Sequence, residues 1–293
     1  LEFRRVLFRS QAEELSGDEE IIVVNWFEGR DAQLPKGPTI GSDGPDSERI
    51  NLSREIENLR RHLNDDEVKR FRSIGADASA ALHEAMKLIE PGDSEVDLAG
   101  EIAEQLWQRD LEPVVLLTSG EERLKRFRHP LPTTQLIGRT AMGVICARRK
   151  GLIASVTRII NFGPISNSMR DTYQRLLLVE SAFLDRTKVG TTFAEAFKSG
   201  QSAYASRGFQ RDEWTKHHQG GPTGYLPRDF TAHEKTEEII GINNAIAWNP
   251  SAEGMKVEDT LLTTSVGFEW ITPLDGWPTV EIQGRVRPDL LSR

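Results

Sequence analysis

The chain has 293 residues, which allows one large domain or two, and its 38% hydrophobic residues and six tryptophans can fill a packed core. Its formal net charge of -8 argues against a surface for nucleic acid or anionic membranes. The single cysteine, Cys146, excludes a disulfide framework and a cysteine-based zinc site, and its apolar surroundings are typical of a core. No apolar run approaches the ~20 residues of a membrane-spanning helix.

The N-terminal part of the chain is the least regular. Residues 1–10 resemble the translation of a common short-read sequencing adapter, and we leave them out of the fold prediction. We therefore expect the natural N-terminus to be missing, so a signal peptide stays an open question and a cytoplasmic location is the default. Residues 21–27 predict a buried strand, and the Pro- and Gly-rich residues 35–46 predict turns.

Helices are expected between residues 50 and 110. Apolar residues recur there at helical spacing and predict one buried face: Val68, Phe71, Ile74, Ala78, Leu82 and Met86. Pro91 and Gly92 end this helix, and Ser94 with Asp97 predicts a capping box for the next one. A strand is then expected over residues 113–117.

A hairpin and a second set of helices follow. Residues 142–147 and 152–162 predict two strands joined by a basic turn that ends in Gly151. Residues 168–188 predict an amphipathic helix, and Thr192 with Glu195 predicts the capped start of another.

Strands return toward the C-terminus. They are expected over residues 239–248, 261–264 and 268–271. The predicted order is two helices, then strands, then two more helices, then strands. This order corresponds to a βααβ unit that occurs twice. This order predicts an α+β fold with internal two-fold character.

A histidine and glycine motif lies between these last elements. His217 and His218 run directly into Gly220 and Gly221, and Arg228 follows shortly after. Glycines let a backbone turn or come close to a ligand, and adjacent histidines can move protons or bind a metal. Taken alone, the motif is equally a glycine turn that happens to hold two histidines.

Four segments together are more specific than this motif. They cover residues 127–130, 151–158, 217–228 and 248–260. Their order and spacing resembles the pita-bread family of creatinase and Xaa-Pro aminopeptidases, the M24 peptidases, over residues 55–290.

The resemblance implies both a fold and a domain organisation. It implies the α+β pita-bread fold, with pseudo-two-fold βααβ halves and a curved antiparallel sheet. Residues 55–293 would form this catalytic-type domain. Residues 11–54 would be the remnant of a creatinase-type N-terminal domain plus a linker.

The peptidases of this family hold two divalent metals with five side chains, and most of these are replaced here. Carried over by position, the two hairpin aspartates fall on Val144 and Ser155, the histidine on Gly221, and the glutamate before proline on Asn249. Only Glu258 is retained. One carboxylate and a serine cannot replace anionic and imidazole donors around two dications. The prediction is that the Mn/Zn/Co site of the family, and any other cofactor, is absent.

The remaining polar residues match substrate-handling positions. His129 matches the histidine before the hairpin, which resembles the catalytic acid/base of creatinase, an enzyme that works without metal. Glu258 would assist His129 by pairing with a histidine or by binding a cationic group of the substrate. His217 matches a substrate-contacting histidine, and Arg228 would hold a substrate carboxylate bidentately. Because side chains alternate along an extended backbone, only one of His217 and His218 is expected to face the cleft, and His217 is favoured.

Each of these residues also has a purely structural interpretation. The alternatives are a strand cap for His129, an ion pair with Asp229 or a nearby acid for Arg228, a remnant of metal binding for Glu258, a local turn bond for Asn249, and solvated surface charges for Arg123 and Arg128. No role is assigned to His62, His83 or His233.

Three functions remain open at this point. The favoured one is a metal-independent hydrolase of C–N bonds in a small carboxylate-bearing or dipeptide-like substrate. The alternatives are a catalytically silent member that binds a ligand or serves as a scaffold, and an Xaa-Pro metallopeptidase. Peptides or small molecules are the expected partners. The family often dimerises through its N-terminal domain, so a homodimer is compatible with the sequence and the oligomeric state stays open.

Overall fold

The computed structural model describes residues 25, 27, 37, 39–43 and 49–293. The chain divides into two compact units, Leu1–Ile56 and Glu57–Arg293. In the described part of the first unit, β1 (Gly41–Ser42) and β2 (Ile50–Asn51) pair in parallel. The strand predicted over 21–27 lies almost wholly outside the described residues. The assignment of residues 11–54 to a domain remnant stays a prediction.

Helices occupy the predicted stretch between residues 50 and 110: α2 (Ser53–Arg61), α3 (Asp65–Leu88) and α4 (Glu95–Trp107). Asn64 and Glu67 form a capping box on α3, and Ser94 and Asp97 form the predicted box on α4. The six apolar residues predicted to share one face of α3 are all buried, because that face packs on the hairpin of the first sheet.

The first sheet holds the predicted hairpin. Its strands are β3 (Glu112–Gly120), β4 (Thr140–Arg149), β5 (Leu152–Asn161) and β14 (Leu291–Ser292), in the order β14-β5-β4-β3, and α5 (Glu121–Leu124) follows β3. The β4–β5 turn places Lys150 at φ 48° and Gly151 at φ 85°. Positive φ at both positions suits a tight hairpin turn, so the basic turn and its glycine are explained. Only β14 runs parallel to its neighbour β5.

The second half repeats this order of helices and strands. It contains α6 (Asn167–Arg186), α7 (Phe193–Ser206), the 3-10 helix η2 (Glu213–Lys216), β6 (Gly220–Thr223), β7 (Ala245–Trp248), β8 (Ser251–Ala252), β9 (Met255–Lys256), β10 (Asp259–Thr264), β11 (Gly267–Trp270), β12 (Thr279–Ile282) and β13 (Arg285–Pro288). An antiparallel sheet has the order β11-β10-β7-β6, β8 pairs with β9, and β12 pairs with β13. Thr192 and Glu195 form the predicted capping box on α7.

Two predictions for this half are wrong in detail. The strand expected over 239–248 is confined to Ala245–Trp248, because Asn243 adopts φ 57° and Asn244 Oδ1 accepts a hydrogen bond from the Gly241 amide. The Gly220–Gly221 pair is not a turn. It forms the start of strand β6, paired with β7.

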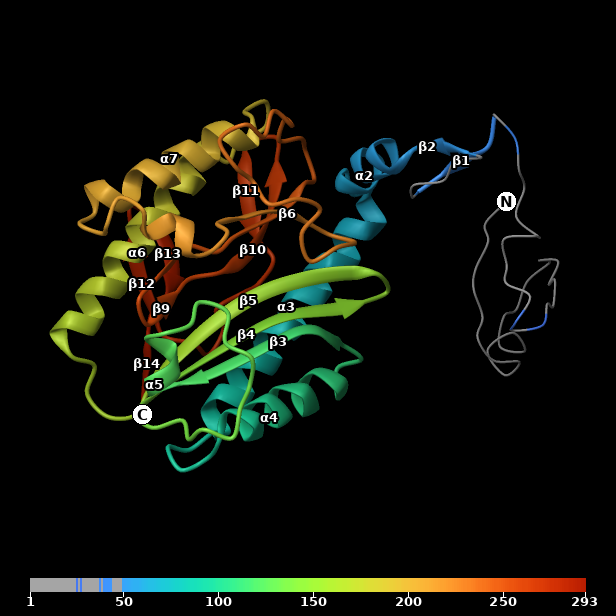
Figure 1. Ribbon diagram of the computed structural model, residues 1–293. Helices are drawn as coiled ribbons and strands as arrows, with labels where there is room; N and C mark the ends of the chain where they lie inside the picture. The colour runs from blue at the N-terminus through green and yellow to red at the C-terminus, as the bar shows by residue number, and fades with distance from the viewer. Residues whose placement is uncertain (1–24, 26, 28–36, 38, 44–48) are drawn as a thin grey trace. The chain divides into compact units, whose positions relative to one another are not determined.

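The two sheets meet along β5 and β10. The Ser155 amide donates to Thr260 Oγ1 at 2.8 Å, and the Thr157 amide donates to the Glu258 carbonyl at 3.0 Å. In Figure 1, α3 and α4 lie along the sheet of β3, β4 and β5, whereas α6 and α7 lie over the other half. Within the described part of the chain, no helix is long and apolar enough to cross a bilayer.

Buried charges also join the halves. Asp259 accepts a hydrogen bond from Arg158 at 3.0 Å and another from Arg287 at 2.9 Å. Arg287 binds Glu180 of α6 through two hydrogen bonds of 2.7 and 2.5 Å, and Arg158 donates to His83 of α3 at 2.8 Å. All five residues are buried. His83, for which the sequence predicts no role, is therefore part of the contact between α3 and the sheet.

Two helical glycines test this packing. A Cβ on Gly75 of α3 would lie 2.0 Å from the Ile271 carbonyl oxygen, whereas a Cβ on Gly100 of α4 would meet no atom within 4 Å. Gly75→Ala is expected to lower the free energy of unfolding by about 3 kcal/mol. Gly100→Ala is expected to raise it by up to about 1 kcal/mol. Urea unfolding of both variants measures the contrast, and equal effects would contradict this description of α3.

Candidate functional site

Three imidazole rings form the outer part of the site. His129 is exposed on the loop after α5, and His217 and His218 lie between η2 and β6. The His129 ring centroid lies 5.0 Å from that of His217 and 6.0 Å from that of His218. The rings of His217 and His218 stack at 4.3 Å.

This arrangement corrects one prediction. His217 and His218 were expected to point to opposite sides, but both rings lie beside His129. Strand alternation does not apply to them, because the β6 ladder begins only at Gly220. The Gln219 side chain, which donates to the carbonyls of Trp214 and His217, holds the segment before the strand.

A buried group of charges forms the floor of the site. Glu258 Oε1 accepts a hydrogen bond from Arg228 Nη2 at 2.5 Å, and Glu258 Oε2 lies 3.0 Å from Lys256 Nζ. Thr157 Oγ1 donates to Glu258 Oε2 at 3.0 Å. We call Lys256, Glu258 and Arg228 the ion triplet. Its side chains are 3%, 2% and 12% exposed, so both carboxylate oxygens are engaged away from solvent.

Burial and the charges of the triplet together set the protonation of the site. Burial alone would raise the pKa of Glu258, but Lys256 and Arg228 lower it to about 2. Burial, reinforced by Lys256, lowers the pKa of His217 to about 2, and burial with Arg228 lowers that of His218 to about 4. Burial and Lys256 also lower the pKa of His129. At neutral pH, neutral imidazoles therefore surround a triplet with one excess positive charge.

Several buried polar atoms of the site have no partner within the described part of the chain. They are both ring nitrogens of His217, Nδ1 of His218, Nε of Arg228 and Oδ1 of Asn249. Buried polar groups are nearly always hydrogen-bonded in folded proteins, because leaving one unpaired is costly. These atoms are donors and acceptors that a ligand can use.

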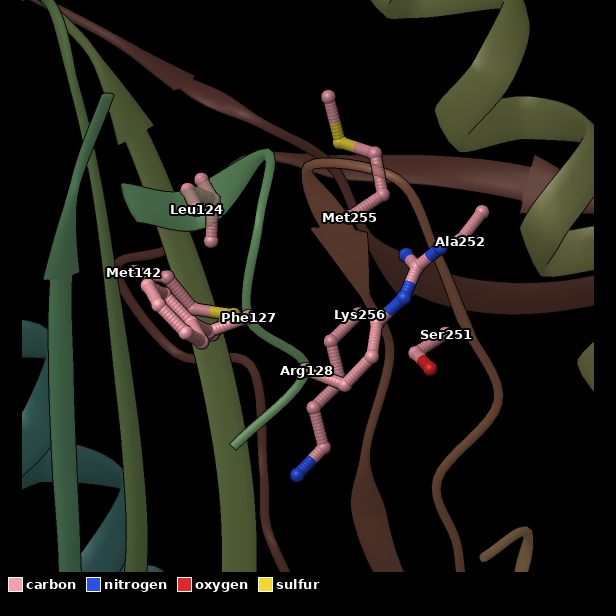
Figure 2. A pocket seen from close by; sticks show the side chains of 8 residues that line it. All are labelled: Leu124, Phe127, Arg128, Met142, Ser251, Ala252, Met255 and Lys256. Atoms are coloured by element: carbon pink, nitrogen blue, oxygen red, sulfur yellow. The ribbon is translucent and has the colours of Figure 1, made fainter. Parts of the chain in front are cut away.

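A crevice too narrow to admit a water molecule lies beside the triplet at Lys256. Its lining residues are Leu124, Phe127, Arg128, Met142, Ser251, Ala252, Met255 and Lys256. Figure 2 shows Leu124, Phe127 and Met142 on one side, Ser251, Ala252 and Met255 on the other, and the two cationic side chains between them.

Comparison with known proteins identifies this arrangement. The model of metallopeptidase family M24 matches residues 69–265, more than half of the sequence. The chain belongs to metallopeptidase family M24. The predicted family and its α+β pita-bread fold are therefore confirmed.

Individual relatives are distant. An uncharacterized peptidase of Staphylococcus aureus (strain MW2) is 22% identical over 83% of this chain and 70% of its own length. The Xaa-Pro dipeptidase of Lactobacillus helveticus is 22% identical over 75% of this chain and 62% of its own length. The prolidase of Thermococcus sibiricus superposes with a TM-score of 0.77 at 15% identity, covering 98% of this chain and 83% of its own.

The positions that the family resemblance assigns to metal ligands have the following surroundings. Val144 is buried in the apolar core. Ser155 Oγ lies 3.2 Å from both Cys146 Sγ and Arg228 Nη1. Arg228 therefore touches two of the five positions, Ser155 and Glu258, and its guanidinium lies between them.

Gly221 leaves no room for a side chain at the position of the family histidine. A Cβ there would lie 2.5 Å from the Phe230 carbonyl oxygen and 3.1 Å from the Ala232 nitrogen. Residues 229–232 run beside β6, with the Asp229 amide bonded to the Pro222 carbonyl and the Ala232 amide to the Gly220 carbonyl. Among the residues that the structure describes, no group of three or more His, Cys, Asp or Glu side chains is placed to hold a metal.

The sequence prediction missed Lys256 and was wrong about two arginines. Lys256 lies two positions before Glu258, a spacing that places both side chains on one face of an extended segment, and this was the available signal. Arg228 pairs with Glu258, so Glu258 is the nearby acid of its structural alternative. Arg128 and Arg123, expected to be solvated, are ion-paired with Glu213 and Glu95.

The triplet predicts a pH-dependent stability. Glu258→Gln is expected to cost about 3 kcal/mol at neutral pH, because two buried cations lose their counter-charge. The pKa of Glu258 in the folded protein (about 2) lies below its ordinary value of 4.5. Its stabilisation is therefore present above about pH 5 and lost as the pH falls toward 2. Urea unfolding of the wild type and the variant across this range measures the difference.

The surface variant Glu122→Gln is the control, since the Glu122 side chain is 76% exposed. It should unfold like the wild type at every pH. A difference between Glu258→Gln and wild type that does not shrink on acidification would show that the carboxylate charge is not what stabilises the floor of the site.

Proposed function

We propose that this chain is a metal-independent M24 protein that hydrolyses a C–N bond in a small carboxylate-bearing or dipeptide-like substrate. The observation that carries the proposal is the ion triplet, in which Lys256 and Arg228 engage both carboxylate oxygens of Glu258. The substrate class follows from the similarity to proteins named Xaa-Pro dipeptidase and prolidase.

The residues at the family's metal positions do not fit two divalent ions. Val144 and Gly221 offer no donor atom, and Ser155 and Asn249 offer only neutral oxygens. The remaining carboxylate, Glu258, already balances two cations. A dication placed beside Lys256 and Arg228 would be repelled by both. No step of the proposed reaction therefore uses a metal.

In the proposed reaction His129 acts as general base and then as general acid. Its lowered pKa keeps the exposed ring neutral at neutral pH, so it can take a proton from an attacking water and return it to the leaving nitrogen. The excess positive charge of the triplet would stabilise the negative charge that develops on the substrate carbonyl oxygen. His217 and His218 would supply hydrogen bonds to the substrate through their unpaired ring nitrogens.

One observation favours a second candidate, a catalytically silent member that binds the same ligands. Within the described part of the chain, no group hydrogen-bonds the ring of His129 to fix its tautomer, although such an orienting partner is common for catalytic histidines. A ligand-binding protein needs no such partner. The two candidates differ in turnover and share the same binding site.

Metal content tests the proposal that the protein works without metal. After incubation with excess Mn²⁺, Co²⁺ or Zn²⁺ and dialysis, elemental analysis should find well below one ion per chain, and EDTA should change neither the melting temperature nor the activity. Two ions per chain, lost together with activity on chelation, would establish a metallopeptidase. His218→Ala, which removes one imidazole of the cluster, is the control for adventitious metal binding by the three histidines.

Substitution of His129 tests the proposal that this residue transfers the proton during hydrolysis. His129→Ala should lower kcat for any accepted substrate by about 10²–10⁴-fold, since the proton-transfer group is lost. Its lowered pKa predicts that wild-type activity persists below the usual histidine range near pH 6.5. His233→Ala, at another exposed histidine, should retain full activity. Unchanged turnover in His129→Ala would remove His129 from the reaction, and ligand binding by a wild type that never turns over would favour the second candidate.

A further inference from the structure

We propose that the ion pair between Arg128 and Glu213 positions the ring of His129 in the site. Both members of the pair are then positioning residues, and only the value of that position for catalysis rests on the proposed function. Arg128 lies on the loop after α5 and directly precedes His129. Glu213 is the first residue of η2, and His217 caps the C-terminal end of that helix. The pair therefore joins the two segments that carry the imidazole rings.

The loop that carries His129 is fixed at its two ends. Glu95 of α4 is buried, and its Oε2 accepts hydrogen bonds from the Thr133 amide at 3.0 Å and from Arg123. Arg123 Nη1 also donates to the Leu131 carbonyl at 2.9 Å. These bonds hold the loop before and after His129, but none of them reaches the residues next to the ring.

Next to the ring, the loop depends on a single polar contact. Within the described part of the chain, residues 128–130 take part in no backbone–backbone hydrogen bond. Arg128 Nη2 donates to Glu213 Oε1, and this guanidinium makes no other hydrogen bond among the described residues. The paired side chains are 15% and 8% exposed, so salt and solvent screen them little. Because His129 is the next residue, the pair fixes the backbone from which the ring projects.

Glu213 belongs to a segment that is held independently of this loop. Gln219 Nε2 donates to the His217 carbonyl at 2.7 Å, and the Tyr204 hydroxyl of α7 donates to Gln219 Oε1 at 2.7 Å. The ring of Trp214 in η2 packs edge-on against Phe197 of α7 at 5.6 Å. The helix η2 and the histidines after it therefore rest on α7, and the loop docks onto this support.

Other charges surround the pair without replacing it. Lys216 Nζ lies 2.7 Å from Glu213 Oε2, the oxygen that does not face Arg128. The exposed Glu253 attracts Arg128 but forms no ion pair with it in the described structure. Lys256 lines the same crevice, and because that crevice admits no water molecule, the Arg128 side chain is enclosed by the chain itself (Figure 2). The direction of the guanidinium therefore depends on Glu213.

The test removes the charge of Arg128 and measures the contact between the rings. Arg128→Met keeps an unbranched side chain among apolar neighbours. The ring centroids of His129 and His217 lie 5.0 Å apart, so NMR of histidine-labelled wild type should show cross-relaxation between their ring protons, assigned with His129→Ala. Arg128→Met should lose this signal. Its kcat for any accepted substrate should fall about 10²-fold with KM little changed, because a small misplacement of a catalytic group costs about this much.

Three further variants separate positioning from stability. Arg128→Lys can keep the ion pair, so it should retain the ring contact and at least about tenfold more turnover than Arg128→Met. Glu213→Gln should resemble Arg128→Met, and the double variant should lose no more than Arg128→Met alone, since both changes act through one contact. Arg109→Met removes an ion pair with Glu84 that joins the end of α4 to α3, and it should leave the ring contact and kcat at wild-type values.

The outcomes distinguish this proposal from the proposed function. A ring contact that persists in Arg128→Met and in Glu213→Gln would overturn the positioning role, whether or not the protein turns over a substrate. Additive losses in the double variant, or an unchanged kcat after loss of the ring contact, would overturn it as well. If Arg128→Met does not fold, Glu213→Gln carries the same test. A wild type that shows the ring contact, loses it in these variants and never hydrolyses a substrate would support the positioning and contradict the hydrolase.

Discussion

Two neighbouring carboxylates organise this molecule. Glu258 directly precedes β10 and Asp259 is its first residue, and successive side chains of an extended chain point to opposite faces. Glu258 faces the ion triplet, and Asp259 faces Arg158 and Arg287 in the interior. Breaking a buried ion pair by removing one partner costs about 3–5 kcal/mol, so the position of β10 is fixed from both sides. The loop that carries Arg228, the end of β9 and strand β5 are all held through this one strand.

On our proposal, cationic side chains of this chain supply the positive charge that metal ions supply in metallopeptidases. A reaction at an amide carbonyl needs fixed positive charge near the developing oxyanion. Lysine and arginine provide it here from within the chain, and a single carboxylate is enough to hold both. Burial, reinforced by the same charges, keeps the three imidazoles neutral at neutral pH. The two cationic side chains, the carboxylate of Glu258 and the neutral histidines are thus parts of one charge balance.

The sequence predicted what depends on local rules. The apolar face of α3, the capping boxes of α4 and α7 and the turn at Gly151 follow from spacing and backbone preference, and all are present. The family resemblance pointed to His129, His217 and His218, whose rings lie together, and to Arg228 and Glu258, which form an ion pair. What it could not provide are partners far apart in the chain, such as Arg228 with Glu258 or Arg128 with Glu213. An ion pair between residues far apart in the chain leaves no periodic pattern in the sequence. The direction of the His218 side chain also depends on the residue at which strand β6 begins. Residue propensities do not predict that position.

The closed space beside Gly221 links the residue at this position to the place of Arg228. The backbone of Phe230 and Ala232 occupies the volume that any side chain at position 221 would need. A side chain there would therefore require residues 229–232 to move away from β6. The segment that carries Arg228 to Glu258 leads directly into these residues, so such a movement would also displace the arginine from its ion pair.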